Sequence, residues 1–170
     1  AGDVNGDGFD DLIIGAWGVD YNGSMSGSSY VMFGKESGFI STMDFTELNG
    51  TTGFRLDGIT SFEHSGFSVS GAGDINSDGY DDLIIGARGA KTNGFDSGSS
   101  YVVFGKETAF NSIIQLASLD GSNGFRLDGN VGDYSGYSVS DAGDVNADGY
   151  DDLIIGAYAA APNGGSGRYG

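Results

Sequence analysis

Aspartate and asparagine recur at fixed offsets in three short segments, and the spacing of their oxygen atoms resembles that of a cation-binding loop. In the second segment, Asp74, Asn76, Asp78 and Asp82 occupy positions 1, 3, 5 and 9, with glycine at position 6 for a sharp turn. The backbone carbonyl of Tyr80, at position 7, can turn inward. Calcium takes six to eight oxygen ligands at about 2.3–2.6 Å, so each loop is expected to bind one calcium ion. The expected ligands of the three sites are Asp3, Asn5, Asp7, Phe9, Asp11, Asp74, Asn76, Asp78, Tyr80, Asp82, Asp144, Asn146, Asp148, Tyr150 and Asp152.

The donor types and the loop length narrow the kind of metal site. Oxygen donors alone disfavour zinc and copper, and a flexible loop favours calcium, with magnesium or manganese left as alternatives. An EF-hand would need an acidic residue at position 12 and a helix on each side. Position 12 is isoleucine in all three loops (Ile14, Ile85 and Ile155), inside an apolar run typical of a strand. The loops are therefore expected to connect β-strands, and an EF-hand is excluded.

The three loops belong to a longer repeat that must position them. Near-identical segments begin at Ala1, Ala72 and Ala142, 71 and 70 residues apart, and each ends in Leu-Ile-Ile-Gly-Ala. Other pieces recur in the same order between them, including Ser-Gly-Ser-Ser-Tyr-Val and Gly-Phe-Arg-Leu-Asp-Gly. A fixed period of this length indicates a repeat architecture.

Strand patterns dominate each unit of about 70 residues. Short apolar runs such as 82–87 and 101–104, and alternating runs such as 67–70 and 125–128, give four expected strands per unit. The segment 112–119 comes nearest to a helical pattern and would make a turn or two at most. Four antiparallel strands per repeat, with regular turns, predict an all-β protein made of β-propeller blades.

The chain holds about two and a half such repeats. We expect 1–58 to be a blade lacking its first strand, 59–129 a complete blade, and 130–170 a truncated blade. Closure of a propeller needs at least four blades. The chain is therefore expected to be part of a longer protein or to associate with other chains through its unfinished blade edges.

Composition limits the possible partners. The net charge is −17, and half of the 24 acidic residues lie in the three loops. Such a surface repels phosphate backbones, so nucleic acid is not expected as a partner. No apolar run reaches the length of a membrane span, and the absence of cysteine excludes disulfides and thiolate metal sites.

The units resemble FG-GAP repeats, the blade modules of integrin α-subunit propellers and of many bacterial surface proteins. The most specific match is Asp-x-Asn-x-Asp-Gly-x-x-Asp followed by Leu-Ile-Ile-Gly-Ala. The resemblance implies calcium on inter-strand loops of a seven-bladed propeller. Two features depart from the family pattern: Ser65-Gly66 and Ser135-Gly136 replace the FG element, and Trp17, Arg88 and Tyr158 stand where proline is common.

Few residues outside the loops suggest chemistry. His64 is the only histidine and aligns with Tyr134, so packing is expected rather than catalysis, and no catalytic residue is expected. The position-8 aspartates (Asp10, Asp81 and Asp151) are expected to cap backbone N–H groups or face solvent, with metal ligation as the alternative. Aromatic residues that could pack or form a sugar-stacking surface are Trp17, Tyr21, Tyr158 and Tyr169.

These features together predict a non-enzymatic, extracellular or cell-surface module for adhesion or protein–protein interaction, with calcium in a structural role. A lectin-like propeller that binds glycans is one alternative. The other is an accessory propeller of a larger secreted enzyme.

Overall fold

The computed structural model describes residues 1–39 and 41–161, which form strands joined by turns and loops. The strands are β1 (Leu12–Ala16), β2 (Ser28–Met32), β3 (Gly53–Asp57), β4 (Ser65–Gly73), β5 (Asp82–Ala87), β6 (Ser99–Val103), β7 (Ile113–Gln115), β8 (Gly124–Asp128), β9 (Ser135–Gly143) and β10 (Asp152–Ala157). Two single-turn 3-10 helices are η1 (Phe45–Glu47) and η2 (Leu116–Ser118). Within the described ranges, no helix is long and apolar enough to cross a membrane.

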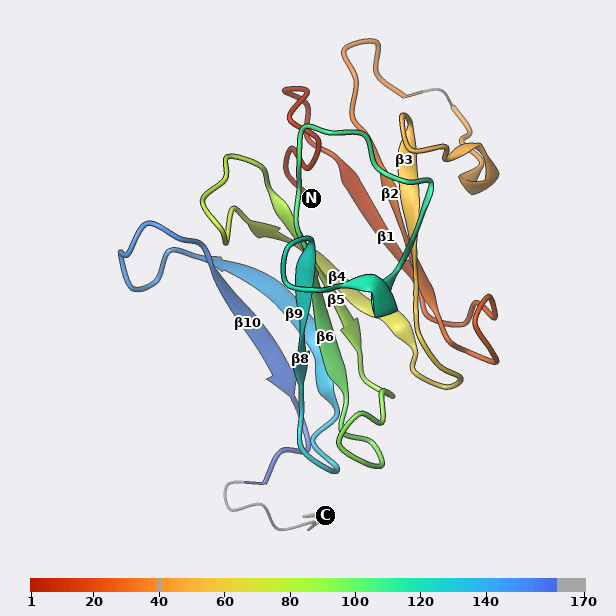
Figure 1. Ribbon diagram of the computed structural model, residues 1–170, viewed down its shortest axis with the longest axis vertical. Helices are drawn as coiled ribbons and strands as arrows, with labels where there is room; N and C mark the ends of the chain where they lie inside the picture. Colours follow the sequence, from red (N-terminus) through yellow and green to blue (C-terminus); the bar gives the residue numbers. More distant parts are fainter. Residues whose placement is uncertain (40, 162–170) are drawn as a thin grey trace.

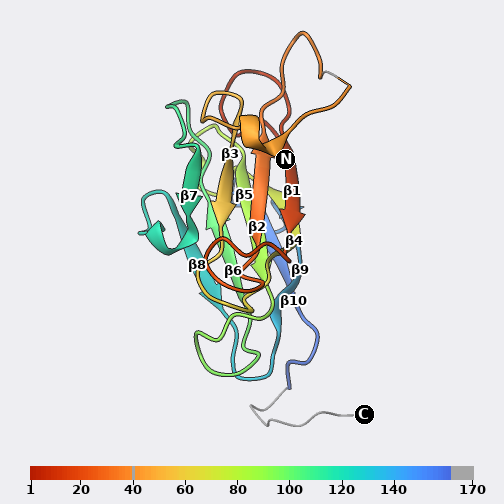
Figure 2. The same cartoon turned by 90° about the vertical axis from the view of Figure 1, so that its right-hand side faces the viewer.

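The strands form three sheets that stand side by side in chain order (Figure 1). The middle sheet has the order β4-β5-β6-β8 and is antiparallel throughout. It is flanked by the sheet β1-β2-β3-β7 on one side and by the pair β9-β10 on the other. The strands run along the long axis of the molecule, with loops gathered at both ends (Figure 2). This arrangement confirms the expected all-β fold of propeller blades, whereas the exact residues that divide the blades stay a prediction.

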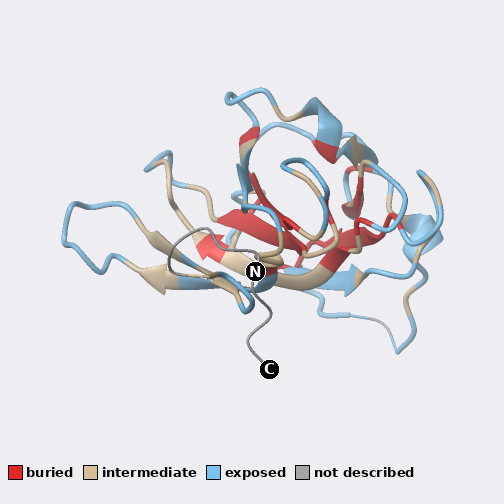
Figure 3. Cartoon of the chain, turned by 90° about the horizontal axis from the view of Figure 1, so that it is seen from below, coloured by how far each residue is buried: buried red, intermediate tan, exposed pale blue. Residues whose placement is uncertain are grey.

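Strand β5 is buried on both faces and divides the apolar core in two. Leu83 and Ile85 pack with residues of the first sheet, whereas Ile84 packs towards Val139 of the third. Successive side chains of a strand point to opposite faces, so this strand needs apolar residues at consecutive positions. The buried residues accordingly concentrate in the middle of the molecule (Figure 3).

One pairing was not expected from the sequence. Strand β7 lies in the long connection between β6 and β8, yet it pairs in parallel with β3 of the first sheet. The segment 112–119 thus forms a short strand followed by a single 3-10 turn. It covers the outer edge of β3, whose backbone groups would otherwise lack strand partners.

Candidate metal centre

The three acidic loops follow one another along one edge of the structure (Figure 1). The second loop connects β4 to β5, and the third connects β9 to β10. The first loop leads directly into β1. In each case the last residue of the nine lies at or beside the start of a strand, so the repeat places three chemically similar loops at equivalent points.

Backbone N–H groups gather the side-chain oxygens inside each loop. In the second loop, the N–H of Asp78 donates to Oδ1 of Asp74 at 3.0 Å and to Oδ1 of Asn76 at 2.9 Å. The N–H of Gly79 donates to Asp74 Oδ2 at 2.8 Å, and that of Tyr80 donates to Asp78 Oδ1 at 3.0 Å. Positions 1, 3 and 5 are therefore held on the inner side of one tight turn.

The same bonds recur in the other two loops. In the first loop, Asp7 N–H donates to Asp3 and Asn5, and Gly8 N–H donates to Asp3 at 2.8 Å. In the third, Asp148 N–H donates to the residues at positions 1 and 3, and Gly149 N–H donates to Asp144 at 2.9 Å. Three independent copies with one geometry show that the nine-residue sequence fixes the turn locally.

Two loop positions have left-handed backbone. Gly79, at position 6, has φ +91°, which explains the glycine recognised in the sequence. Position 4 is also left-handed, with φ +60° at both Ser77 and Ala147, and +73° at Gly6. Sequence reasoning missed this second position because the residue there differs in each copy.

The aspartate at position 9 closes the loop by accepting a hydrogen bond from the backbone N–H of position 2. Asp82 is fully buried, and its carboxylate accepts from the N–H of Ile75 at 3.1 Å and of Gly105 at 2.8 Å. Burial, reinforced by the charges of Asp78 and Asp74, raises the pKa of Asp82 to about 7 despite these hydrogen bonds. Asp11 is held in the same way in the first loop, and burial likewise raises its pKa to about 6.

The donors fit calcium by their chemistry. Every candidate donor is an oxygen, from a carboxylate, a side-chain amide or a backbone carbonyl, and a carboxylate oxygen that accepts one N–H retains a second lone pair. Among the described residues, however, no three Asp, Glu, His or Cys side chains are grouped so that they could hold a metal ion as they stand. The ligand role of the fifteen residues therefore stays a prediction.

The position-8 aspartates act between loops. Oδ2 of Asp81 accepts from the backbone N–H of Asp3 at 2.7 Å, and Oδ2 of Asp151 accepts from that of Asp74 at 2.9 Å. Asp10, the equivalent residue of the first loop, is exposed. The expectation of backbone capping is confirmed for Asp81 and Asp151, but the capped group belongs to the neighbouring repeat.

His64 and two of the expected aromatic residues lie in one packed cluster. The ring of Trp17 lies 5.5 Å from that of His64 and 6.4 Å from that of Phe67. Tyr137 continues the row, 5.1 Å from Phe67 and 4.7 Å from Tyr158.

Tyr21 lies elsewhere, with the Arg55 guanidinium 3.6 Å from its ring centre, and Tyr169 is outside the described residues. Desolvation, followed by the charges of Arg88 and Lys91, lowers the pKa of His64.

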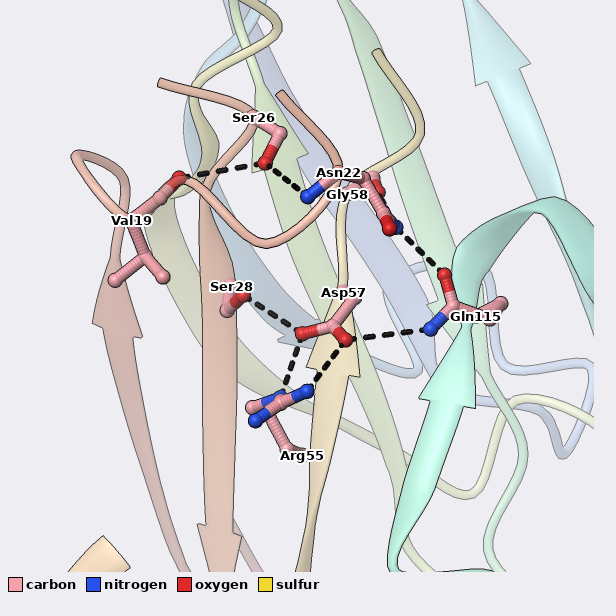
Figure 4. A network of polar contacts seen from close by, with 8 residues as sticks. All are labelled: Val19, Asn22, Ser26, Ser28, Arg55, Asp57, Gly58 and Gln115. Carbon is pink, nitrogen blue, oxygen red and sulfur yellow. Dashed lines mark hydrogen bonds and ion pairs between the residues drawn. The ribbon is translucent and has the colours of Figure 1, made fainter. Parts of the chain in front are cut away.

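A repeated polar network was missed in the sequence although its motifs were noticed. Asp57 is buried, receives two hydrogen bonds from Arg55, and accepts from Ser28 Oγ at 2.8 Å (Figure 4). Gln115 of β7 donates to the same carboxylate at 3.2 Å and accepts from Asn22 at 2.6 Å. The second repeat has the same core of this network at Ser99, Arg126 and Asp128. The recurring serine and Arg-x-Asp motifs are therefore explained by hydrogen bonds between adjacent strands.

These repeats agree with a known family. A model of the FG-GAP repeat matches residues 1–32, 65–103 and 135–168. The chain belongs to the FG-GAP repeat family. In this FG-GAP chain, each match contains one acidic loop and the strand that follows it.

Curated relatives of the FG-GAP chain are much longer proteins. It is 31% identical to integrin alpha-V of Gallus gallus over 92% of its own length and 14% of that relative. It is 29% identical to integrin alpha-4 of Xenopus laevis, over 93% of the chain and 14% of the relative. A phosphatidylinositol-glycan-specific phospholipase D of Dictyostelium discoideum is 32% identical over 95% of the chain and 18% of the relative. The chain thus spans less than a fifth of the length of these three relatives.

Proposed function

We propose that this chain is a non-enzymatic module of an extracellular or cell-surface protein, in which three structural calcium ions rigidify propeller blades that present loops to a protein partner. The observation that carries the proposal is the threefold recurrence of one oxygen-lined turn, with the same hydrogen bonds in every copy. The integrin alpha relatives support the adhesive role.

The loop residues would perform separate tasks. Positions 1, 3 and 5 would supply side-chain oxygens that the loop's own N–H groups already orient, and position 7 would supply a backbone carbonyl. Position 9 would supply a further carboxylate oxygen and would also anchor the loop to the core, since Asp82 is buried and accepts from the N–H of Gly105. A bound cation would supply positive charge that offsets the mutual repulsion of three carboxylates per loop.

The calcium proposal is tested by thermal unfolding in excess chelator and in millimolar calcium. A ligand that binds only the folded state at 100 times its Kd stabilises it by about 2.7 kcal/mol per site, so calcium should raise the unfolding temperature. Asp78→Ala should remove the part of this stabilisation that one calcium site contributes. Asp120→Ala is the matched control, because Asp120 also accepts from a nearby backbone N–H, at 2.9 Å, but lies outside the acidic loops. Identical unfolding temperatures in chelator and calcium would rule out the proposal.

The aromatic row favours a glycan ligand as the second candidate. Trp17, Tyr137 and Tyr158 are 43%, 41% and 65% exposed, so part of each ring is open to solvent. Sugar rings stack on exposed aromatic faces, whereas binding to a protein partner would not require a carbohydrate ligand. A glycan array probed with and without calcium distinguishes the two candidates. Only a lectin-like function predicts saturable glycan binding that Trp17→Ala abolishes.

An accessory role beside a catalytic domain is a third candidate. The Dictyostelium relative is named as a phospholipase D, and the matched region makes up 18% of it. Activity against phosphatidylinositol-glycan anchors should then require a further domain, and the 170-residue chain alone should release none.

A further inference from the structure

The position-8 aspartates join neighbouring acidic loops by a two-way backbone link. Asp81 Oδ2 accepts from the N–H of Asp3 at 2.7 Å, and the N–H of Asp81 donates to the carbonyl of Asp3 at 3.2 Å. Asp151 and Asp74 make the same pair of bonds, at 2.9 and 3.5 Å. Position 8 of one loop thus holds the backbone of position 1 in the preceding loop.

The sequence around position 1 is adapted to this contact. Gly2 and Gly73 precede position 1, and a Cβ on either would lie 2.3 or 2.1 Å from the carboxylate oxygen of Asp81 or Asp151. Gly143 is the equivalent residue of the third loop and has the same left-handed backbone, with φ +62°, but a Cβ there would meet nothing within 4 Å. The close approach therefore comes from the neighbouring loop and not from the turn itself.

A second contact joins the same loops. A Cβ on Gly6, at position 4 of the first loop, would lie 2.4 Å from Cε1 of Tyr80, so the ring rests on that loop's backbone. Between the second and third loops, Ser77 Oγ donates to the carbonyl of Gly149 at 3.5 Å. Residues at or next to the expected ligand positions thus touch across both loop junctions.

We propose that Asp81 and Asp151 are positioning residues, each of which raises the cation affinity of the loop in the preceding repeat rather than of its own loop. The inference rests on the proposed calcium function. Asp74 is both an expected ligand and the residue whose backbone Asp151 holds. When that backbone is fixed, less conformational freedom is lost as the cation binds, which strengthens binding.

The experiment follows calcium titration of each loop separately by nuclear magnetic resonance of the 170-residue chain. The amides of Gly8, Gly79 and Gly149 each donate to the position-1 carboxylate of their own loop, so each reports one site. Asp151→Ala should raise the calcium Kd reported by Gly79 about tenfold, which corresponds to about 1.4 kcal/mol. The Kd reported by Gly149 should change much less.

Asp10→Ala is the matched control. It removes the same charge from position 8 of the first loop, but the Asp10 carboxylate makes no hydrogen bond within the described part of the chain. It should change no neighbouring loop, so it measures the purely electrostatic effect on its own site. Asp151→Asn keeps an oxygen acceptor at position 8, so it tests the proposal even if Asp151→Ala fails to fold. Because charged hydrogen bonds are about twice as strong as neutral ones, it should raise the Kd at Gly79 about threefold.

The outcomes separate the two proposals. If the Kd at Gly79 is unchanged in both Asp151 variants, or if only Gly149 weakens, the positioning role is overturned while calcium binding stands. If no glycine amide responds to calcium in the unmodified chain, the proposed function fails and the positioning role fails with it.

Discussion

Ser28 and Ser29 are neighbours on β2 and both are fully buried, yet their hydroxyl groups meet different surroundings. Ser28 donates to the carboxylate of Asp57, whereas Ser29 Oγ has no hydrogen-bond partner among the described residues. For single residues, the sequence motif therefore does not show which side chain forms a hydrogen bond, because that depends on the partner it meets in the folded structure. The motif Ser-Gly-Ser-Ser was visible in the sequence, but which of its serines forms a bond depended on a strand 29 residues away.

The two serines give a paired stability test. Ser28→Ala should lower the free energy of unfolding by about 1.5 kcal/mol, because a hydrogen bond to a charged group is lost. Ser29→Ala should leave it unchanged or raise it by up to about 1 kcal/mol, since an unsatisfied buried hydroxyl is removed. Urea unfolding of both variants measures the difference, and equal losses would contradict the assignment.

At the scale of elements, glycine sets how closely neighbouring sheets approach. Gly86 lies in β5, and a Cβ on it would lie 2.1 Å from the backbone carbonyl oxygen of Gly136 in β9. Gly15 in β1 stands in the same relation to Gly66 in β4, at 2.1 Å. The departure from the FG element is consistent with this packing, because Ser65 at the start of β4 is fully buried against the first sheet.

Gly86→Ala should therefore push two sheets apart. We expect a loss of about 1–3 kcal/mol in the free energy of unfolding, the usual range for overpacking. Gly156→Ala is the matched substitution in β10, where the new Cβ would clash with the hydroxyl of Ser138, at 2.2 Å, and the next atoms lie at an ordinary contact distance of 3.5 Å. That hydroxyl can rotate away, so a change of less than about 1 kcal/mol is expected. Thermal or urea unfolding of both proteins provides the comparison, with similar losses counting against sheet-to-sheet contact as the cause.

At the scale of the whole molecule, one sequence has three environments. Leu-Ile-Ile-Gly-Ala occurs in β1, β5 and β10. Leu83 and Ile84 in β5 are fully buried, whereas the residue equivalent to Leu83 in β1, Leu12, is 45% exposed and the residue equivalent to Ile84 in β10, Ile154, is 61% exposed. Each copy forms a strand, but among the described residues only the middle copy has a sheet on both sides.

Leucine truncation should reveal this difference. Leu83→Ala should lower the free energy of unfolding by about 2–5 kcal/mol, since it opens a cavity in the core. Leu12→Ala should cost less than about 1 kcal/mol in the 170-residue chain because the side chain is half exposed already. Chemical denaturation of both variants decides the matter, and comparable losses would show that the first sheet is covered in solution.

The sequence by itself determined the local features of this protein. The repeated strands, the turn glycine at position 6 and the inward side chains at positions 1, 3 and 5 depend on residues within nine positions of one another, and all three copies adopt them. The assignment of these side chains as calcium ligands is a prediction that the chelator experiment tests.

Tertiary structure alone decided the features that join one repeat to another. The pairing of β7 with β3, the capping of Asp3 by Asp81 and the unequal burial of three identical strands each depend on segments distant in sequence. Such contacts depend on how the sheets pack against one another, and a local pattern of residues does not show which distant segments become its neighbours in the fold. The acidic loops were therefore recognisable as three separate turns, whereas the hydrogen bonds that connect them became visible only in the folded molecule.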